Sequence, residues 1–475
     1  MGMTFKRRYA NRSMHAAFIT GIILFSVVAP DTVLQNFNPE QQRTVVLLLL
    51  AIYLWTVSKM PTGAASILIL AMIIIMNLTD SVEDAMAGFL SSALYFILIL
   101  SVLSQVLIKT DADKVITSKI LKIKNISPKK IALILPLFMS LLPVMMPSAF
   151  ARLKTVLPFV NGLNDAFQFS EGSVFRKYAM YVTGLVNQNS TMIVYTGGGY
   201  PVLAAQLLKD YGVADLSWIS WFLIIAPPLW CALIITSVFS WFYLKLSYPS
   251  ESTKDFTPDE NTQVTDHDEY KATKMFWFVI ATFTLMIATW IFTDSGTVPT
   301  LLPPMILTVI YALPKIELIT NEDIRAFNWE NFLLIGASLS IGVILDQNGT
   351  ARMIAEQLLR LVPENAAMTL NIVIVTVIVF LFRMIFIVPT SAVIVIFPVM
   401  LSYADMTGIP ALSLAFIVIM IIGGTNILPI HSPTLYFAFK EGVLSRKDHY
   451  IMAAFSSFTF LVISILAASF YWIFW

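Results

Sequence analysis

Charged residues are scarce in this sequence. Of its 475 residues only 12% are Asp, Glu, Lys or Arg, whereas 57% are hydrophobic. A soluble domain carries about 25% charged residues. The mean hydropathy of +0.79 leaves too little polar surface to cover a globule in water, so lipid must surround much of the chain. The sequence therefore predicts an all-helical protein that crosses a cell membrane many times.

Cysteine is nearly absent as well. The single cysteine, Cys231, excludes an internal disulfide and a metal cluster held by thiolates. The sequence also lacks the GxxxxGK[ST], HExxH and GxSxG motifs that would indicate ATP use or hydrolysis. No carboxylate lies in a predicted midplane region, since Asp346 and Glu364 fall at an outer boundary. We therefore expect no enzyme activity, no cofactor beyond an ion and no nucleic-acid partner.

Long apolar runs dominate what remains. A helix needs about 20 apolar residues to cross the hydrocarbon core. About eleven runs approach this length, near residues 14–30, 44–59, 61–77, 89–108, 178–207, 217–246, 275–293, 298–314, 331–346, 411–439 and 450–474. Two further segments, 131–162 and 369–402, exceed one crossing and are interrupted near their middle by proline and small polar residues.

The positions of the cations predict the topology. The stretch MGMTFKRRYANR lacks a convincing cleavage site, so we interpret it as the cytoplasmic flank of a first helix rather than a signal peptide. If both interrupted segments return to the side they entered from, most of the 30 Lys and Arg residues lie on the side of the N-terminus. Only Arg43, Lys209, Arg352 and Arg360 fall on the opposite side. This bias predicts a cytoplasmic N-terminus, an extracytoplasmic C-terminus and two re-entrant hairpins.

The two halves of the chain resemble each other. The stretch from Phe96, FILILSVLSQVLIKTDADKVITSKIL, aligns with the stretch from Phe332, FLLIGASLSIGVILDQNGTARMIAEQLL, and Pro158 then aligns with Pro398. Because the two hairpins enter from opposite sides, we predict inverted repeats. The N-terminal repeat takes residues 1–245 with hairpin 131–162, a flexible cytoplasmic linker takes 246–274, and the C-terminal repeat takes 275–475 with hairpin 369–402.

Each half continues with a second interruption, LVNQNSTMIVYTGGGYP (185–201) and IGGTNILPIHSPTLYF (422–437). An unpaired backbone group in hydrocarbon costs several kcal/mol, so such breaks are tolerated mainly around a hydrated cavity. Helix N-termini at the breaks attract anions, and carbonyls and hydroxyls hold a small cation or a substrate. Four breaks at matching places are typical of a secondary transporter with a central site.

At this point the sequence resembles the divalent anion:sodium symporter family, which carries di- and tricarboxylates or sulfate. The order of spans, the two hairpins, the helix from Phe332 and the break LPIHSPTLYF carry the resemblance. It implies a homodimer in which a transport domain built from the hairpins moves against a scaffold, in the manner of an elevator.

The hairpin tips depart from that family, in which each tip reads Ser-Asn-Thr and contacts both substrate and sodium. Here the tips read Ser148-Ala149-Phe150 and Val388-Pro389-Thr390. Without the asparagines, the two sodium sites and the dicarboxylate clamp do not carry over. Sodium stays an alternative near the oxygen-bearing residues Ser148, Asn189, Thr390 and Asn426.

Arg152 and Lys154 follow the first tip. A cation at the bilayer midplane is costly, so we expect it to face a cavity or a partner. Our hypothesis is that Arg152 permanently supplies the charge that sodium supplies elsewhere in the family and holds the anion through its planar fork. Transport would then be sodium-independent exchange or proton-coupled. In the alternative, both cations lie shallow and snorkel toward the cytoplasm.

For two other residues, the sequence allows both a functional and a structural role. Arg383 is either a second anion contact or a snorkelling cation, and His431 either carries a coupling proton or only forms hydrogen bonds. The predicted substrate site comprises Ser148, Ala149, Phe150, Arg152, Asn187, Asn189, Ser190, Thr191, Pro389, Thr390, Ser391, His431, Ser432 and Thr434.

The predicted cargo is a small organic or inorganic anion. A larger amphipathic anion of the cell envelope is the alternative, because the tips are bulky and 13% of the residues are aromatic. A membrane glycosyltransferase or polymerase would need acidic or His residues in a large outer loop, and the predicted outer loops are short.

Overall fold

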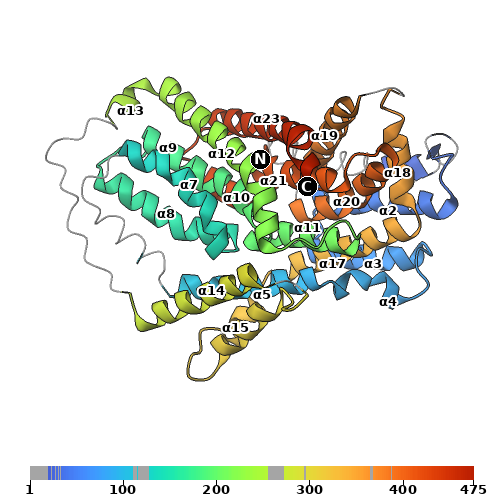
Figure 1. The fold of residues 1–475 in the computed structure, drawn as a ribbon, viewed down its shortest axis with the longest axis horizontal. Helices are drawn as coiled ribbons and strands as arrows, with labels where there is room; N and C mark the ends of the chain where they lie inside the picture. The colour runs from blue at the N-terminus through green and yellow to red at the C-terminus, as the bar shows by residue number, and fades with distance from the viewer. Residues whose placement is uncertain are drawn as a thin grey trace, which may run out of the picture. The chain divides into compact units, whose positions relative to one another are not determined.

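The computed structural model describes residues 20–22, 24–26, 28–29, 32, 34–110, 115, 128–254, 272–293, 296–363, 367–386 and 388–475. All secondary structure in these ranges is helical, as the sequence predicts (Figure 1). The chain forms two compact units, each assembled from two separate stretches of sequence. Unit 1 contains Met1–Leu94 and Asn328–Ala415, and unit 2 contains Tyr95–Phe327 and Phe416–Trp475.

Unit 1 contains two groups of helices. Its N-terminal stretch forms α2 (Pro39–Thr56), α3 (Thr62–Ile75), α4 (Val82–Ala85) and the short 3₁₀ helix η2 (Ala87–Leu90). Its second stretch forms α17 (Trp329–Gln347), α18 (Thr350–Leu359), α19 (Met368–Ile385), α20 (Pro389–Thr407) and the start of α21 (Ala411–Gly424).

In unit 1, α17 packs closely against α3 and η2 (Figure 1). A glycine makes this approach feasible, because a Cβ atom on Gly88 would lie 2.3 Å from the carbonyl oxygen of Gly336. The Gly88 N–H donates to Ser340 Oγ at 3.1 Å, so the contact is polar as well as close. Local signals also start the helices, since Asn38 and Gln41 form a reciprocal capping box at α2.

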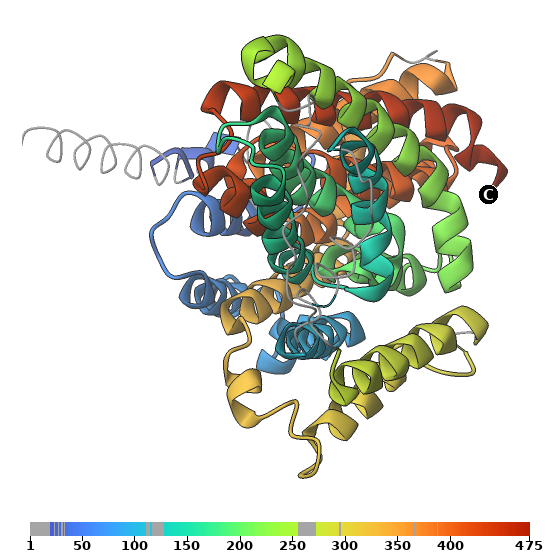
Figure 2. The ribbon, with the colours of Figure 1, turned by 90° about the vertical axis from the view of Figure 1, so that its left-hand side faces the viewer.

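Unit 2 contains most of the chain. Its long helices are α5 (Ser92–Lys109), α7 (Pro128–Met145), α8 (Ala149–Ala166), α12 (Trp218–Ser247), α14 (Lys274–Phe292) and α23 (Arg446–Phe470). Its shorter helices are α9 (Val174–Tyr181), α10 (Asn187–Ser190), α11 (Gly199–Asp210), α13 (Pro249–Lys254), α15 (Leu302–Ala312), α16 (Asn321–Arg325) and α22 (Pro433–Lys440). Figures 1 and 2 both show α14 and α15 side by side.

In unit 2, α12 packs along α23 (Figure 1). The rings of Phe239 and Phe455 stack across this contact with centroids 3.6 Å apart. Ser217 and Ser445 cap the two helices by accepting hydrogen bonds from backbone N–H groups three residues on.

Eight of the described helices are long and apolar enough to cross a membrane: α5, α7, α12, α14, α17, α19, α20 and the helical stretch Arg446–Phe474. The predicted runs near 298–314 and 411–439 are represented by shorter apolar helices, α15 and α21. Of the first predicted run, 14–30, the structure describes only residues 20–22, 24–26 and 28–29. Most of the predicted linker, 246–274, lies outside the described residues, although α13 occupies its start.

Both interrupted segments are pairs of helices. The first consists of α7 and α8, separated by residues 146–148, and the second consists of α19 and α20, separated by residues 386–388. Each arm has 18 or 19 residues. At 1.5 Å per residue, such an arm is about 27 Å long, nearly the thickness of the hydrocarbon core. The re-entrant course of the hairpins therefore stays a prediction, as do the inverted repeats.

Candidate functional site

The first hairpin turn lies at Met146, Pro147 and Ser148. Ser148 is the N-cap of α8, and its Oγ accepts a hydrogen bond from the Ala151 N–H at 3.3 Å. Pro147 has no backbone N–H to donate, and Ser148 caps the helix that follows, so the two residues together mark the turn. The sequence prediction of a break at this point is confirmed.

The side chain of Arg152 is fully buried beside this turn, at 0% exposure, and forms a hydrogen bond to it. The Nε atom donates to Asn187 Oδ1 at 2.7 Å, and Nη2 donates to the Asn187 carbonyl (3.2 Å) and to Thr191 Oγ1 (2.8 Å). The Nη1 atom donates to the carbonyls of Met146 (2.6 Å) and Gly197 (3.2 Å). All five N–H donors of a guanidinium are thus used inside the protein.

The charge of Arg152 has no acidic partner within 4 Å in the part of the chain that the structure describes. All its hydrogen-bond partners are neutral oxygens. Their dipoles stabilise the positive charge, but no negative charge among them neutralises it. This burial does not fit the snorkelling alternative. The guanidinium N–H groups that would bind a substrate directly are also used by protein oxygens.

The first broken helix runs from α9 through a π-helical turn (Val182–Val186), α10 and two short 3₁₀ helices, Thr191–Ile193 and Tyr195–Gly197, to α11. A Cβ atom on Gly197 would lie 2.3 Å from the carbonyl oxygen of Thr191, so the chain folds back on itself there. The predicted unwinding around 185–201 is confirmed. π-helical turns of this kind are frequent at functional sites.

Three consecutive side chains of α10 contact different elements. Asn187 accepts from Arg152 and donates from Nδ2 to the Ala149 carbonyl at 2.8 Å. Gln188 accepts at Oε1 from Ser432 Oγ (2.7 Å) and Thr434 Oγ1 (3.3 Å), which belong to the second broken helix. Sequence reasoning missed Gln188, although a polar run in an apolar segment was the available signal.

Asn189 completes this arrangement. Its Nδ2 donates to Ser456 Oγ of α23 at 3.2 Å, and its Oδ1 accepts from Asn426 Nδ2 at 3.0 Å. Asn426 follows the end of α21 and also donates to the Gly423 carbonyl at 2.7 Å. The first hairpin and both broken helices therefore meet in one buried polar network within unit 2.

The second broken helix consists of α21, the 3₁₀ turn η6 (Pro429–His431) and α22. Ser432 caps α22, and its Oγ lies 2.8 Å from Thr434 Oγ1. His431 is buried, at 1% exposure. The predicted break at 422–437 is confirmed.

The second hairpin turn belongs to unit 1. Pro389 is the first residue of α20, and Ser391 accepts a hydrogen bond from Ser338 of α17 at 3.2 Å. Thr390 is buried, and its Oγ1 has no hydrogen-bond partner among the described residues. Arg383 is fully buried and donates from Nη1 to the Phe386 carbonyl.

The predicted site residues therefore form two sets. Unit 2 brings together Ser148, Ala149, Arg152, Asn187, Asn189, Ser190, Thr191, Ser432 and Thr434. Pro389, Thr390 and Ser391 lie in unit 1. Phe150 is 38% exposed and packs edge-to-face on Phe437 with centroids 6.1 Å apart.

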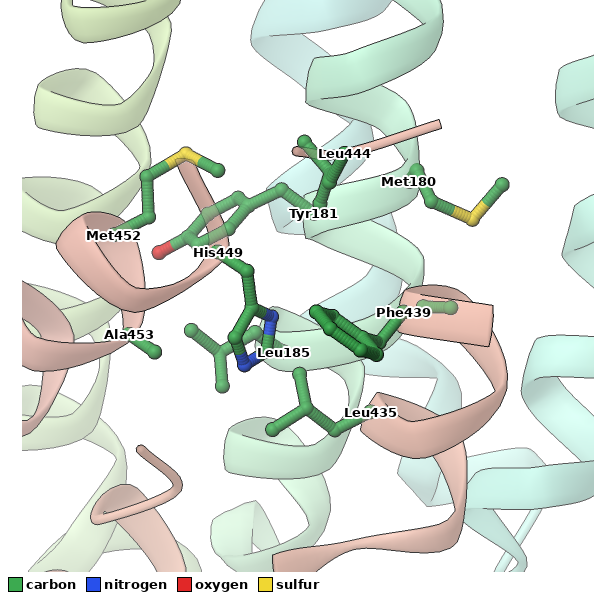
Figure 3. A pocket seen from close by; sticks show the side chains of 10 residues that line it. Met180, Tyr181, Leu185, Leu435, Phe439, Leu444, His449, Met452 and Ala453 are labelled. Atoms are coloured by element: carbon green, nitrogen blue, oxygen red, sulfur yellow. The ribbon is translucent and has the colours of Figure 1, made fainter. Parts of the chain in front are cut away.

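A small cavity lies beside the second broken helix (Figure 3). Its lining comes from the end of α9 and the π-helical turn, from α22 and from α23, and is mostly apolar. His449 contributes a ring whose Nε2 lies 3.3 Å from the Ile427 carbonyl. The cavity has room for about one water molecule and no cationic Lys or Arg, so it does not suit an anionic substrate.

A chain whose described residues include eight long apolar helices, with polar groups gathered at breaks in the apolar interior, has the features of a multi-pass membrane transporter. The comparisons with known proteins give the family. The chain belongs to the divalent anion:sodium symporter family, because residues 7–475 match the family described as the sodium:sulfate symporter transmembrane region.

Two curated relatives agree with this assignment. The chain is 24% identical to the putative malate transporter YflS of Bacillus subtilis over 340 residues, which cover 69% of this chain and 68% of YflS. It is 26% identical to the chloroplastic dicarboxylate transporter 2.1 of Arabidopsis thaliana over 256 residues, 52% of this chain and 44% of that protein. The chain is an anion transporter, and the sequence prediction that it is not an enzyme is confirmed.

Proposed function

We propose that the protein is a secondary active transporter of a small dicarboxylate such as malate, and that it works without sodium. The site forms around the first hairpin turn and the two broken helices of unit 2. The names of the two relatives support a dicarboxylate as cargo.

One observation carries the sodium-independent part of the proposal. The Arg152 guanidinium is fully buried at a hairpin turn and has no acidic partner in the described ranges. In a medium of low dielectric constant its field acts over many ångströms and favours an anion nearby, even though its N–H groups are used by the protein. Arg152 then provides the fixed positive charge, and direct contacts to the substrate come from neighbouring groups.

The order of elements supports two repeats. In the first half, α5 precedes the hairpin α7–α8, a broken helix and the long α12. In the second half, α17 precedes the hairpin α19–α20, a broken helix and the long α23. From the positions of the Lys and Arg residues we place the N-terminus in the cytoplasm and the C-terminus outside. Following the family, we propose a homodimer that works by an elevator motion.

The test is uptake of radiolabelled malate by purified protein in liposomes, with and without a sodium gradient. We expect uptake in sodium-free buffer, and we expect Arg152→Gln to abolish it while Arg152→Lys retains part of it, because only the lysine keeps the charge. Uptake that requires sodium, or an Arg152→Gln protein that folds and transports normally, contradicts the proposal.

A larger amphipathic anion is the second candidate. It is favoured by the half-exposed Phe150 and its neighbour Phe437 beside the first turn. Competition decides between the two: a long-chain acidic lipid precursor that displaces labelled malate at lower concentration than malate itself would favour the larger cargo.

A further inference from the structure

The two cations after the first hairpin turn have different surroundings. Arg152 is fully buried and uses every N–H donor inside unit 2. Lys154, two residues further along α8, is exposed. It donates no hydrogen bond and pairs with no acid among the residues that the structure describes. A residue two positions on points to the opposite side of a helix, so the two cations serve different surfaces.

An aromatic ring holds the Lys154 side chain. Its Nζ lies 4.9 Å from the centroid of the Phe150 ring, one helical turn earlier. The Phe150 ring is fixed in turn by Phe437 of α22, with an angle of 82° between the ring planes. A cation–π contact uses one face of the ammonium group and leaves N–H donors free.

Lys154 occupies an electrostatically unfavourable place. It lies in the second turn of α8, where the helix dipole presents its positive end. A positive charge there raises the free energy of the helix instead of stabilising it. If the first hairpin re-enters the membrane as predicted, a lysine that faces lipid is costly as well. An anion beside Lys154 removes both penalties.

We propose that Lys154 makes the direct charge contact with a carboxylate of the transported anion, while Arg152 holds the turn and adds its field. Ser148 lies six residues before Lys154, so their Cα atoms are about 9 Å apart along the helix axis, and the ammonium group reaches back from there over the Phe150 ring toward the tip. Phe150 forms the apolar wall beside this contact. The inference rests on the proposed transport of a small anion and names the residue that recognises its charge.

The first test compares malate uptake by three variants in phosphatidylcholine liposomes. Lys154→Gln should raise KM by about 10-fold or more, since a charge-assisted hydrogen bond is lost. Lys154→Arg, which keeps the charge, should stay within about 3-fold of wild type. The matched control is Lys130→Gln, which removes an exposed cation at the start of α7 and should leave KM unchanged.

The second test does not depend on transport rates. In a Cys231→Ser background, Lys154→Cys is labelled with the cationic reagent 2-aminoethyl methanethiosulfonate. Malate should slow this labelling, and the attached ammonium group should restore a low KM. An anionic reagent of similar size should not restore it.

The possible failures are distinguishable. If wild type takes up malate and Lys154→Gln has an unchanged KM, this inference is wrong and the proposed function stands. If wild type takes up no malate, the proposed function fails and this inference falls with it. If Lys154→Gln changes only the response of thermal stability to added phosphatidylglycerol, the lysine pairs with lipid phosphate and the inference is wrong.

Discussion

At the scale of single residues, Arg152 and Arg383 perform similar local tasks in their own units. Each guanidinium is fully buried and donates to a carbonyl at the C-terminal end of the first arm of its hairpin, Met146 for Arg152 and Phe386 for Arg383. A cation there interacts favourably with the negative end of the helix dipole. The sequence predicted that Arg152 and Arg383 lie near proline breaks. In the structure, their N–H groups donate to carbonyls of the hairpin turns themselves.

Asn187 gives a test of the charge on Arg152. We expect Asn187→Asp to weaken malate binding more than Asn187→Ala does, because only aspartate pairs with the guanidinium and cancels its field. Both variants lose the hydrogen bond to the Ala149 carbonyl, so alanine is the matched control. Isothermal titration with malate measures the difference, and equal affinities for the two variants would show that the charge plays no part.

Asp323 gives a pH-dependent contact outside the membrane-spanning helices. Burial alone would raise its pKa, but hydrogen bonds from Lys109 Nζ at 2.7 Å and from Thr320 outweigh it and hold the pKa of Asp323 below its ordinary value. A lowered pKa in the folded state means that the contact stabilises the protein above about pH 4, the unfolded value, and that this contribution is lost as pH falls further.

We therefore expect Asp323→Asn to lower Tm at pH 7 and to have a smaller effect at pH 3, where the unfolded carboxyl is protonated and the contact contributes less. Thermal unfolding in detergent at both values measures this. Asp80→Asn, which changes an exposed carboxylate, is the control and should shift Tm little at either pH. An equal gap between Asp323→Asn and wild type at both pH values would contradict the assignment.

At the scale of elements, the π-helical turn of the first broken helix packs directly on α22. A Cβ atom on Gly184 would lie 2.8 Å from the Cβ atom of Ala438, closer than real Cβ contacts. The contact brings Gln188 within reach of Ser432 and Thr434. The sequence predicted both breaks from their prolines, glycines and polar residues, but it carried no sign that the two would pair.

Gly184→Ala should therefore destabilise the protein by about 1–3 kcal/mol through overpacking, and adding Ala438→Gly should restore most of the loss. Gly162→Ala in α8 is the control, because nothing lies within 4 Å of its new Cβ atom and alanine favours a helix. Chemical or thermal unfolding of the four proteins measures these changes. A double variant no more stable than Gly184→Ala alone would reject the close contact.

At the scale of the whole molecule, the topology is the main prediction still to be tested. In a Cys231→Ser background, Lys130→Cys and Asp165→Cys flank the first hairpin on exposed positions. If α7 and α8 re-enter, a membrane-impermeant maleimide should label both only after the cells are opened. Arg352→Cys, predicted to lie outside, should be labelled in intact cells. Labelling of Asp165→Cys from outside would mean that the segment crosses the membrane.

Composition and local chemistry determined much of this protein. The shortage of charge required a membrane, and the long apolar runs required helices, because lipid satisfies no backbone hydrogen bond. Prolines, capping serines and glycines at 147–148, 197–199 and 429–433 fixed where the helices break. These are local effects, which depend on neighbours in the sequence and can be read from it.

The tertiary structure alone decided the partners of the buried polar groups. Arg152 meets Asn187, 35 positions away, and Gln188 meets Ser432, 244 positions away. Which distant segment satisfies a buried donor depends on how the helices pack, and the sequence pattern does not encode those pairings locally. For the same reason, only the structure separates Arg152, whose donors are all used, from Lys154, whose donors have no hydrogen-bond partner among the residues that the structure describes.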